Sequence, residues 1–361
     1  MNFIEYEERN EFVPEDLEDG WASDKEYFGS DAISNSDLRV FDKEGPASFW
    51  AYKYDPDYVK VKATDSQEFG TLLHTLIYEE QEYKKRYTQF LGKRPTSTQM
   101  EGFCQDINNG MEATLAYCNN YSTKNKSQQA IIETTEMLYD DLYSYITALR
   151  LQGNKKIITQ ALLDNAEKGK ENYLFHPRVR FVQEMLATDD CEVFRECGIY
   201  WHSNYGFDCR AKVDEVIVNH TKKIIYKNDL KSTYNVHPSS FGTSRHVTYD
   251  DGSTQILLTG SIAKWDYDQQ IAFYDLAINE SSFRKDHNCE GYEIENSIMA
   301  VKNTAPFNVN CYGFSKETVQ AATAKIQQKM ENIAGYLESG SKEFDDWQDY
   351  KFTRNNGRFV I

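Results

Sequence analysis

Apolar residues recur every three to four positions in several parts of the chain, a spacing that predicts amphipathic helices. The segment 67–80 is the clearest case, because Phe69, Leu72 and Leu76 fall on one face with His74 beside them. Ser34, Asn35 or Ser36 could cap a helix that opens the segment 33–41. The other segments with this spacing are most of 95–190, 266–279 and 315–338.

Between residues 192 and 230 the pattern changes to three runs rich in Val, Ile, Tyr and Phe, broken at "SNYG" and "NHTKK". Short runs of this composition, bounded by turn residues, are typical of strands in a meander. Residues 297–302 and 307–314 predict two further strands. We therefore expect a mixed α/β (α+β) fold, with a central mixed sheet flanked by helices and a helical insertion before the meander.

The chain of 361 residues is long enough for one large domain. We expect an acidic arm over residues 1–30, a single domain over 31–345 and a tail over 346–361. The helical insertion would occupy about 95–190 within that domain.

Charge and cysteine content narrow the classes of function. The formal charge is −17, which argues against a generally basic nucleic-acid binder but leaves room for a local basic groove. The seven cysteines form no C-x-x-C pair, so neither a zinc ribbon nor a disulfide framework is indicated. The acidic start lacks a signal-peptide pattern and no apolar run is long enough to span a membrane, so we expect a soluble, intracellular protein without membrane contact.

The segment "KKIIYKNDLKST" ends a predicted strand with Asp229 and Lys231, 15 residues after Asp214 on the preceding strand. Residues two apart on a strand share a face, and a short hairpin would bring Asp214 to the same place. Neighbouring carboxylates repel unless a cation separates them, and hard oxygen ligands favour Mg²⁺ or Mn²⁺. A nearby lysine can orient the attacking water and offset charge on a phosphate. The alternative to a catalytic motif is an ordinary solvated strand end, since short motifs often match by chance.

Two helical segments carry further polar candidates. "QIAFY" places Gln270 and Tyr274 four residues apart, hence on one helix face. "GTLLH" places His74 four residues after Gly70, where it could reach a metal. Ordinary core packing is the alternative for both Tyr274 and His74.

Taken in order, these motifs resemble the PD-(D/E)-x-K nuclease superfamily, in its RecB-like branch, and most of all the exonuclease VIII (RecE-like) group of phages and prophages. The matching segments are "ISNSDL" (33–38), "GTLLH" (70–74), "CRAKVD" (209–214), "DLKST" (229–233) and "QIAFY" (270–274). The resemblance covers roughly residues 31–340 and implies a restriction-endonuclease-like core.

The resemblance also implies roles for individual residues. Asp214 and Asp229 would bind a catalytic Mg²⁺, with Mn²⁺ an alternative, and Lys231 would be the catalytic lysine. Gln270 and Tyr274 would position the lysine, the water or the DNA strand. The further metal-ligand candidates are the carbonyl of Leu230, His74 and, more weakly, Glu196. Val213 replaces the family's usual proline, which supplies no ligand.

The activity implied is digestion of linear double-stranded DNA from its ends, 5′ to 3′, leaving 3′ single strands for an annealing protein. Relatives form rings around DNA, so a homo-oligomer in the cytoplasm of a phage-carrying bacterium is the corresponding expectation. A basic bore would reconcile DNA binding with an acidic exterior. Candidate DNA contacts are Lys222, Lys223, Lys227 and Arg245, with Ser232 and Thr233 as secondary candidates.

Three alternatives stay open from the sequence. A related nuclease with an iron-sulfur cluster needs four suitably placed cysteines, which the sequence does not offer, so no cluster is expected. A structure- or sequence-specific endonuclease could use the same core. A non-catalytic protein, either an acidic DNA mimic or a DNA-end binder, would explain the charge but not the ordered motifs.

Overall fold

The computed structural model describes residues 27, 29–55, 58, 64–92, 94–248 and 254–338, and the backbone of 354–355 and 358–359. These residues fall into two compact units. The first unit comprises the described parts of Met1–Ser66, Tyr173–Lys302 and Asn308–Ile361, and the second comprises Gln67–Asn172 and Asn303–Phe307. Each unit is described by itself.

A five-stranded sheet with the order β3-β4-β5-β8-β9 forms the centre of the first unit. Strands β5 and β8 are parallel, and the other neighbours are antiparallel. The predicted meander and the two later strands are present, and the expected mixed α/β fold is confirmed. The strands are β3 (Cys191–His202), β4 (Asp208–Asn219), β5 (Ile224–Thr233), β8 (Glu293–Lys302) and β9 (Val309–Gly313).

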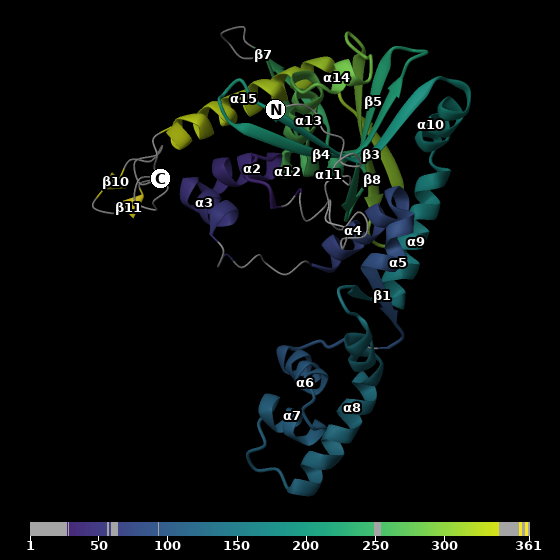
Figure 1. Cartoon of the computed structure of the whole chain (residues 1–361), viewed down its shortest axis with the longest axis vertical. Helices are drawn as coiled ribbons and strands as arrows, with labels where there is room; N and C mark the ends of the chain where they lie inside the picture. Colours follow the sequence, from purple (N-terminus) through teal and green to yellow (C-terminus); the bar gives the residue numbers. More distant parts are fainter. Residues whose placement is uncertain are drawn as a thin grey trace. The chain divides into compact units, whose positions relative to one another are not determined.

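Helices cover both faces of this sheet (Figure 1). On one face, α13 (Tyr267–Glu280) packs against β3, β4 and α15 (Lys316–Glu338), and their apolar side chains form the main core. On the other face, Val182 and Met185 of α10 (Pro177–Thr188) pack on Ile217 and Tyr226. Both α13 and α15 lie where the apolar spacing predicts helices.

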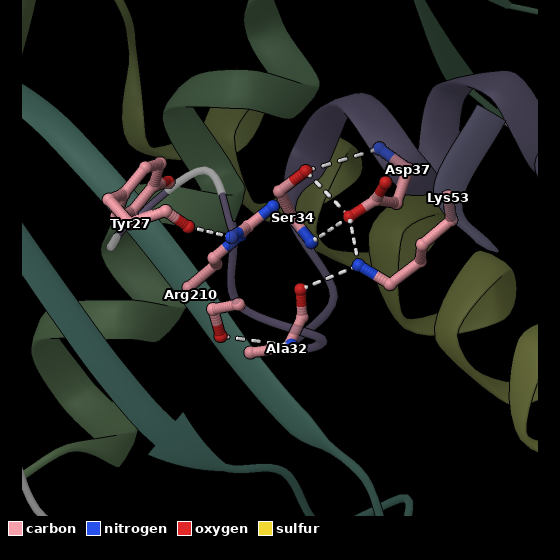
Figure 2. Close-up of polar contacts among 7 residues, drawn as sticks. Tyr27, Ala32, Ser34, Asp37, Lys53 and Arg210 are labelled. Carbon is pink, nitrogen blue, oxygen red and sulfur yellow. Dashed lines mark hydrogen bonds and ion pairs between the residues drawn. The ribbon is translucent and has the colours of Figure 1, made fainter. Parts of the chain in front are cut away.

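The "ISNSDL" segment has a structural explanation (Figure 2). Ser34 caps α2 (Asn35–Glu44): its Oγ accepts a bond from the Asp37 amide at 3.3 Å, and Asp37 Oδ2 accepts one from the Ser34 amide at 2.7 Å. Lys53 of α3 (Pro46–Tyr54) donates to the buried Asp37 carboxylate at 3.2 Å. Ile33 bridges to Cys209 of β4, so this motif fastens α2 to the sheet.

Several short elements of the first unit escape the sequence patterns. An antiparallel hairpin of β6 and β7 lies between the meander and α13. The short elements are α11 (Pro238–Phe241), β6 (Ser244–Thr248), β7 (Thr254–Leu258), α12 (Gly260–Trp265), α14 (Phe283–Asp286), β10 (Arg354–Asn355) and β11 (Arg358–Phe359).

The second unit is mainly helical and has its own core, formed by α6, α7, α8 and their neighbours. Its bounds differ from the expected insertion at 95–190, because residues 67–94 belong to it and 173–190 do not. A parallel pair of β1 and β2 interrupts the helical pattern. The elements are α4 (Asp65–Tyr78), η2 (Glu80–Glu82), α5 (Tyr83–Arg86), β1 (Tyr87–Phe90), α6 (Thr98–Asn108), α7 (Ala113–Asn120), α8 (Gln128–Leu151), β2 (Lys156–Thr159) and α9 (Gln160–Phe175).

Among the residues that the structure describes, no helix combines the length and the apolar character needed to cross a bilayer.

Candidate active site

Asp214 and Asp229 occupy opposed positions on β4 and β5. The last backbone pair of this ladder is Glu215 with Asn228, and the two aspartates hold the next positions beyond it. There, Asp214 Oδ2 accepts a hydrogen bond of 2.7 Å from the Leu230 amide. This bond fixes the Asp214 carboxylate one residue from Asp229, as the motif spacing predicts.

Glu196 extends this pair onto β3. The β3–β4 ladder keeps one register on both sides of Glu196, which places Glu196 opposite Asp214. Carboxylate oxygens of these two residues lie within 4.8 Å of one another. Glu196 has a φ of 52°, a left-handed conformation that is uncommon outside glycine, and the backbone pairing skips it. We call Glu196, Asp214 and Asp229 the acidic row.

Strand β4 changes its packing at the acidic row. On one side of Asp214, Val216 and Val218 are buried in the main core, whereas on the other side Ala211 and Val213 are. In a regular strand, residues of odd and even number point to opposite faces of the sheet. Odd-numbered residues therefore face the core before Asp214, and even-numbered residues face it afterwards. This change places the acidic row at a distortion of the strand.

The Asp229 carboxylate is completely buried, with 0% of the residue exposed. Within the described part of the chain, its Oδ1 accepts no hydrogen bond, and the Lys231 ammonium is the one donor close to its Oδ2. A carboxylate offers about four acceptor positions, so burying one with a single lysine partner leaves most of them unfilled, which is costly. Oxygen ligands of this kind suit Mg²⁺ or Mn²⁺, so the residues of the acidic row fit a divalent cation.

Lys231 lies next to Asp229 on the same face of β5. Its Nζ is 2.5 Å from Asp229 Oδ2, and 18% of its side chain is exposed. Burial lowers the pKa of Lys231, but the charges of Asp229 and Asp214 outweigh burial and raise that pKa above its ordinary value. The ammonium is therefore charged at neutral pH and reaches the surface beside the acidic row.

Helix α13 brings Gln270 and Tyr274 to this face of the sheet. Gln270 Nε2 donates a hydrogen bond of 2.7 Å to the Tyr274 hydroxyl, as expected for residues one turn apart. Burial raises the pKa of Tyr274 well above its ordinary value, and the charges of Asp229 and Asp214 raise it further. Tyr274 consequently keeps its proton and lies within electrostatic reach of both aspartates.

Two residues beside the acidic row were missed by the sequence reasoning. Lys212 Nζ forms an ion pair of 2.9 Å with Glu196, and the ring centroid of Tyr267 lies 5.4 Å from Lys231 Nζ. Neither residue carries a sequence signal. The same-face rule fails between Lys212 and Asp214, because the strand alternation switches at Asp214. The contact of Tyr267 depends on how α13 packs.

His74 belongs to α4 in the second unit, where its ring lies 5.8 Å from that of Tyr78. Its role as a metal ligand stays a prediction, as does that of the Leu230 carbonyl.

The structure contradicts the prediction that Lys227 contacts DNA. Its side chain is 0% exposed and points towards α13. Its Nζ donates to the Ile271 carbonyl at 2.7 Å and to Asp275 Oδ1 at 2.5 Å. The sequence analysis included it as one of the basic residues that could line a DNA-binding bore. Lys227 instead fastens β5 to α13.

The other candidate DNA contacts stay predictions. Lys222 and Lys223 lie in the β4–β5 turn, about 20 Å along β5 from Asp229. Lys222 Nζ pairs with Asp189 at 3.2 Å. Arg245 is exposed on β6. The secondary candidates make long, weak hydrogen bonds: Ser232 Oγ donates to the Ser66 carbonyl at 3.4 Å, and Thr233 Oγ1 donates to the Asn235 carbonyl at 3.5 Å.

A mixed sheet carrying two aspartates and a lysine on adjoining strands defines a PDDEXK-like protein. The family model described as "PDDEXK-like domain of unknown function (DUF3799)" matches residues 34–343. The chain belongs to this family, and the match supports a nuclease.

Among solved structures, the chain is similar to a crystal structure described as a "Putative exonuclease" from Eubacterium rectale. The identity is 13%, the TM-score is 0.32, and the match covers 82% of this chain and 96% of that chain. At this TM-score the similarity supports no argument about function. No curated protein matches the chain.

Proposed function

We propose that this protein is a metal-dependent exodeoxyribonuclease that digests linear double-stranded DNA from its ends, 5′ to 3′. The main support is the buried Asp229 carboxylate, whose one close donor among the described residues is the Lys231 ammonium at Oδ2. It lies between Asp214 and the charged Lys231 on the same part of the sheet. Membership of a PDDEXK-like family supports the same class of chemistry.

The acidic row would hold Mg²⁺, with Mn²⁺ as an alternative ion. A bound divalent cation lowers the pKa of coordinated water and offsets the charge that develops on a phosphate during hydrolysis. The chain contributes three carboxylates whose positions are fixed by the register of β3, β4 and β5. The bond from the Leu230 amide to Asp214 and the ion pair between Lys212 and Glu196 hold two of these carboxylates in place.

Lys231 and α13 would supply the remaining groups. The Lys231 ammonium keeps its proton at neutral pH, so it can orient a water and offset negative charge on the scissile phosphate. The Tyr274 hydroxyl accepts a bond from Gln270 and retains its own proton for donation. Both side chains therefore act as fixed donors facing negative charge.

The finer parts of this proposal rest on the ordered motifs and their resemblance to the RecE-like group. They are the 5′ to 3′ polarity, the 3′ single strands for a recombination partner that anneals DNA, a homo-oligomeric ring, and a phage-type role in the bacterial cytoplasm. Of the DNA contacts, Lys222, Lys223, Arg245, Ser232 and Thr233 remain part of the proposal.

The test is incubation of the purified protein with end-labelled linear duplex and with closed circular DNA, in Mg²⁺ or in EDTA. The proposal expects loss of the linear duplex alone, dependent on metal, with the 5′ label released before the 3′ label. Asp229→Ala should be inactive. Glu293→Gln is the matched control, because that acid lies on β8 with 69% of its side chain exposed and pairs only at the surface with Lys316.

Other outcomes lead to other functions. Cut circles would replace the exonuclease with an endonuclease of the same core. Intact DNA in every reaction, with wild-type protein that still binds duplex ends, would favour a non-catalytic end binder. Cleavage that survives both EDTA and Asp229→Ala would remove the acidic row from the mechanism.

A further inference from the structure

Trp265 is an exposed tryptophan surrounded by cations at the end of α12. The residue is 43% exposed. The guanidinium carbon of Arg39 lies over its ring, 5.1 Å from the centroid, and Lys264 Nζ lies over it at 4.8 Å. Lys43 Nζ bonds the Lys264 carbonyl at 3.5 Å, which adds a third cation. We call Trp265, Arg39, Lys43 and Lys264 the tryptophan platform.

The platform is held in place by Asp266. This residue has a φ of 55° and forms the corner between α12 and α13. Asp266 Oδ2 pairs with Lys43 and lies 3.7 Å from Arg39 Nε, so α2 is tied to the corner. Asp266 thus contacts Arg39 and Lys43, whose side chains are still 39% exposed. With Lys264 this corner groups three cations on a chain of formal charge −17, next to Asp42 and Glu44 of α2.

The platform adjoins the candidate active site through the start of α13. Trp265 precedes Tyr267 by two residues, so their Cα atoms are at most about 7.6 Å apart. The Tyr267 ring in turn lies 5.4 Å from Lys231 Nζ. Successive phosphates of one strand rise by roughly 3.4 Å, so a strand over Lys231 reaches the platform within a few nucleotides.

We propose that the tryptophan platform binds single-stranded DNA next to the site of cleavage. A base stacks on the indole of Trp265 in place of a cation that lies over it, and Arg39, Lys43 and Lys264 contact the flanking phosphates. An exposed aromatic ring beside cations is the combination that binds single strands, because unpaired bases offer a free face for stacking. In a duplex those faces are covered by neighbouring bases. The assignment of a DNA strand to this surface rests on the proposed nuclease function.

Binding is measured by fluorescence anisotropy of a labelled oligo(dT) of about 16 nucleotides, the upper end of common site sizes, with the full chain in EDTA. Stacking energies predict that Trp265→Ala raises the Kd roughly 5- to 150-fold. Trp265→Phe, which keeps a smaller ring, should raise it less. Tyr143→Ala is the matched control, because Tyr143 is 55% exposed on α8 and its ring contacts Tyr139. It should leave the Kd unchanged.

A blunt hairpin duplex without a single-stranded end separates stacking from general attraction to phosphate. Trp265→Ala should change its Kd less than about twofold, since no base face is free to stack. Arg39→Gln with Lys264→Gln should reduce the salt dependence of oligo(dT) binding by roughly one to two phosphate contacts.

Unchanged oligo(dT) affinity in a folded Trp265→Ala protein, checked by its thermal melt, would overturn the proposal. An equal loss on the blunt duplex would overturn it as well. Because binding is measured without metal or cleavage, the result is independent of the proposed activity, whose failure would appear separately in the Asp229→Ala cleavage assay.

Discussion

Two neighbouring rows of the same sheet differ in how many hydrogen-bond partners their buried polar side chains have. In the acidic row, the buried Asp229 has one close donor among the described residues, the Lys231 ammonium at Oδ2, and its Oδ1 accepts no hydrogen bond. In the next row, on the opposite face, the side chains are fully connected. Glu215 accepts from Arg195 at 3.3 Å and from Asn228 at 2.8 Å, and Ser297 donates to Asn228 at 2.6 Å. We call Arg195, Glu215, Asn228 and Ser297 the satisfied row.

The two rows share strands β3, β4 and β5, so the difference does not arise from the general quality of the packing. Where the sheet needs a buried carboxylate for structure, as at Glu215, it supplies donors for both oxygens. The unfilled acceptors of Asp229 are therefore a local exception. Such exceptions are typical of functional sites, because stability is lost there in return for binding or catalysis.

The largest expected effect is on activity in the acidic row. Asp229→Asn keeps the side-chain volume but removes the charge, and it should lower kcat/KM for linear duplex about 10⁴-fold, or ~5.5 kcal/mol. In EDTA its free energy of unfolding should stay within about 1 kcal/mol of the wild type, because the loss of the ion pair with Lys231 is offset by the removal of a buried, under-bonded charge. A large loss of stability in urea would show that Asp229 is a structural residue.

The second prediction contrasts the two lysines on the same face of β5. Lys227→Met leaves Asp275 without its buried partner and should lower the free energy of unfolding by about 3–5 kcal/mol. Lys231→Met also leaves a buried partner, Asp229, without its ion pair and should lower stability as well, but it should in addition lower kcat per folded molecule, whereas Lys227→Met should act on stability alone. Denaturant melts and turnover measured on both variants check this; reversed effects would contradict the roles given to them.

Metal should stabilise the acidic row. At about 100 times the Kd for Mg²⁺, the wild-type free energy of unfolding should rise by about 2.7 kcal/mol. Asp214→Asn should abolish most of this gain, because it removes a ligand charge. Thermal melts in Mg²⁺ and in EDTA provide the measurement, and an equal gain in both proteins would place the ion elsewhere.

The smallest effect is expected in the satisfied row. Asn228→Ala leaves Glu215 Oε2 and the Ser297 hydroxyl without this partner and should cost about 1–3 kcal/mol of stability. Turnover per folded molecule should change only a few-fold, since these groups lie on the face away from α13. A loss of activity comparable to that of Asp229→Asn would remove the distinction between the rows.

Much of the fold follows from the sequence because its elements are long and strongly patterned. Helices α13 and α15 and the five strands of the main sheet lie where the apolar spacing places them. The short β6–β7 and β1–β2 pairs escape, since four or five residues carry little periodic signal.

Only some residues of the candidate site could be predicted from the sequence. Asp214, Asp229 and Lys231 follow from strand alternation and hairpin register. Glu196 does not, because its left-handed backbone and the change in core parity at Asp214 break the alternation. The burial of Lys227 depends on Asp275 in α13, 48 residues away in sequence, so no local pattern indicates it.

The central claim is that the acidic row holds a divalent cation. The most direct test is a crystal of the full chain grown with Mn²⁺, with the ion located by its anomalous scattering. The account predicts a peak within about 2.0–2.4 Å of carboxylate oxygens of Asp214 and Asp229, lost in Asp229→Asn. A peak bound to other residues, or no peak at saturating Mn²⁺, would contradict it.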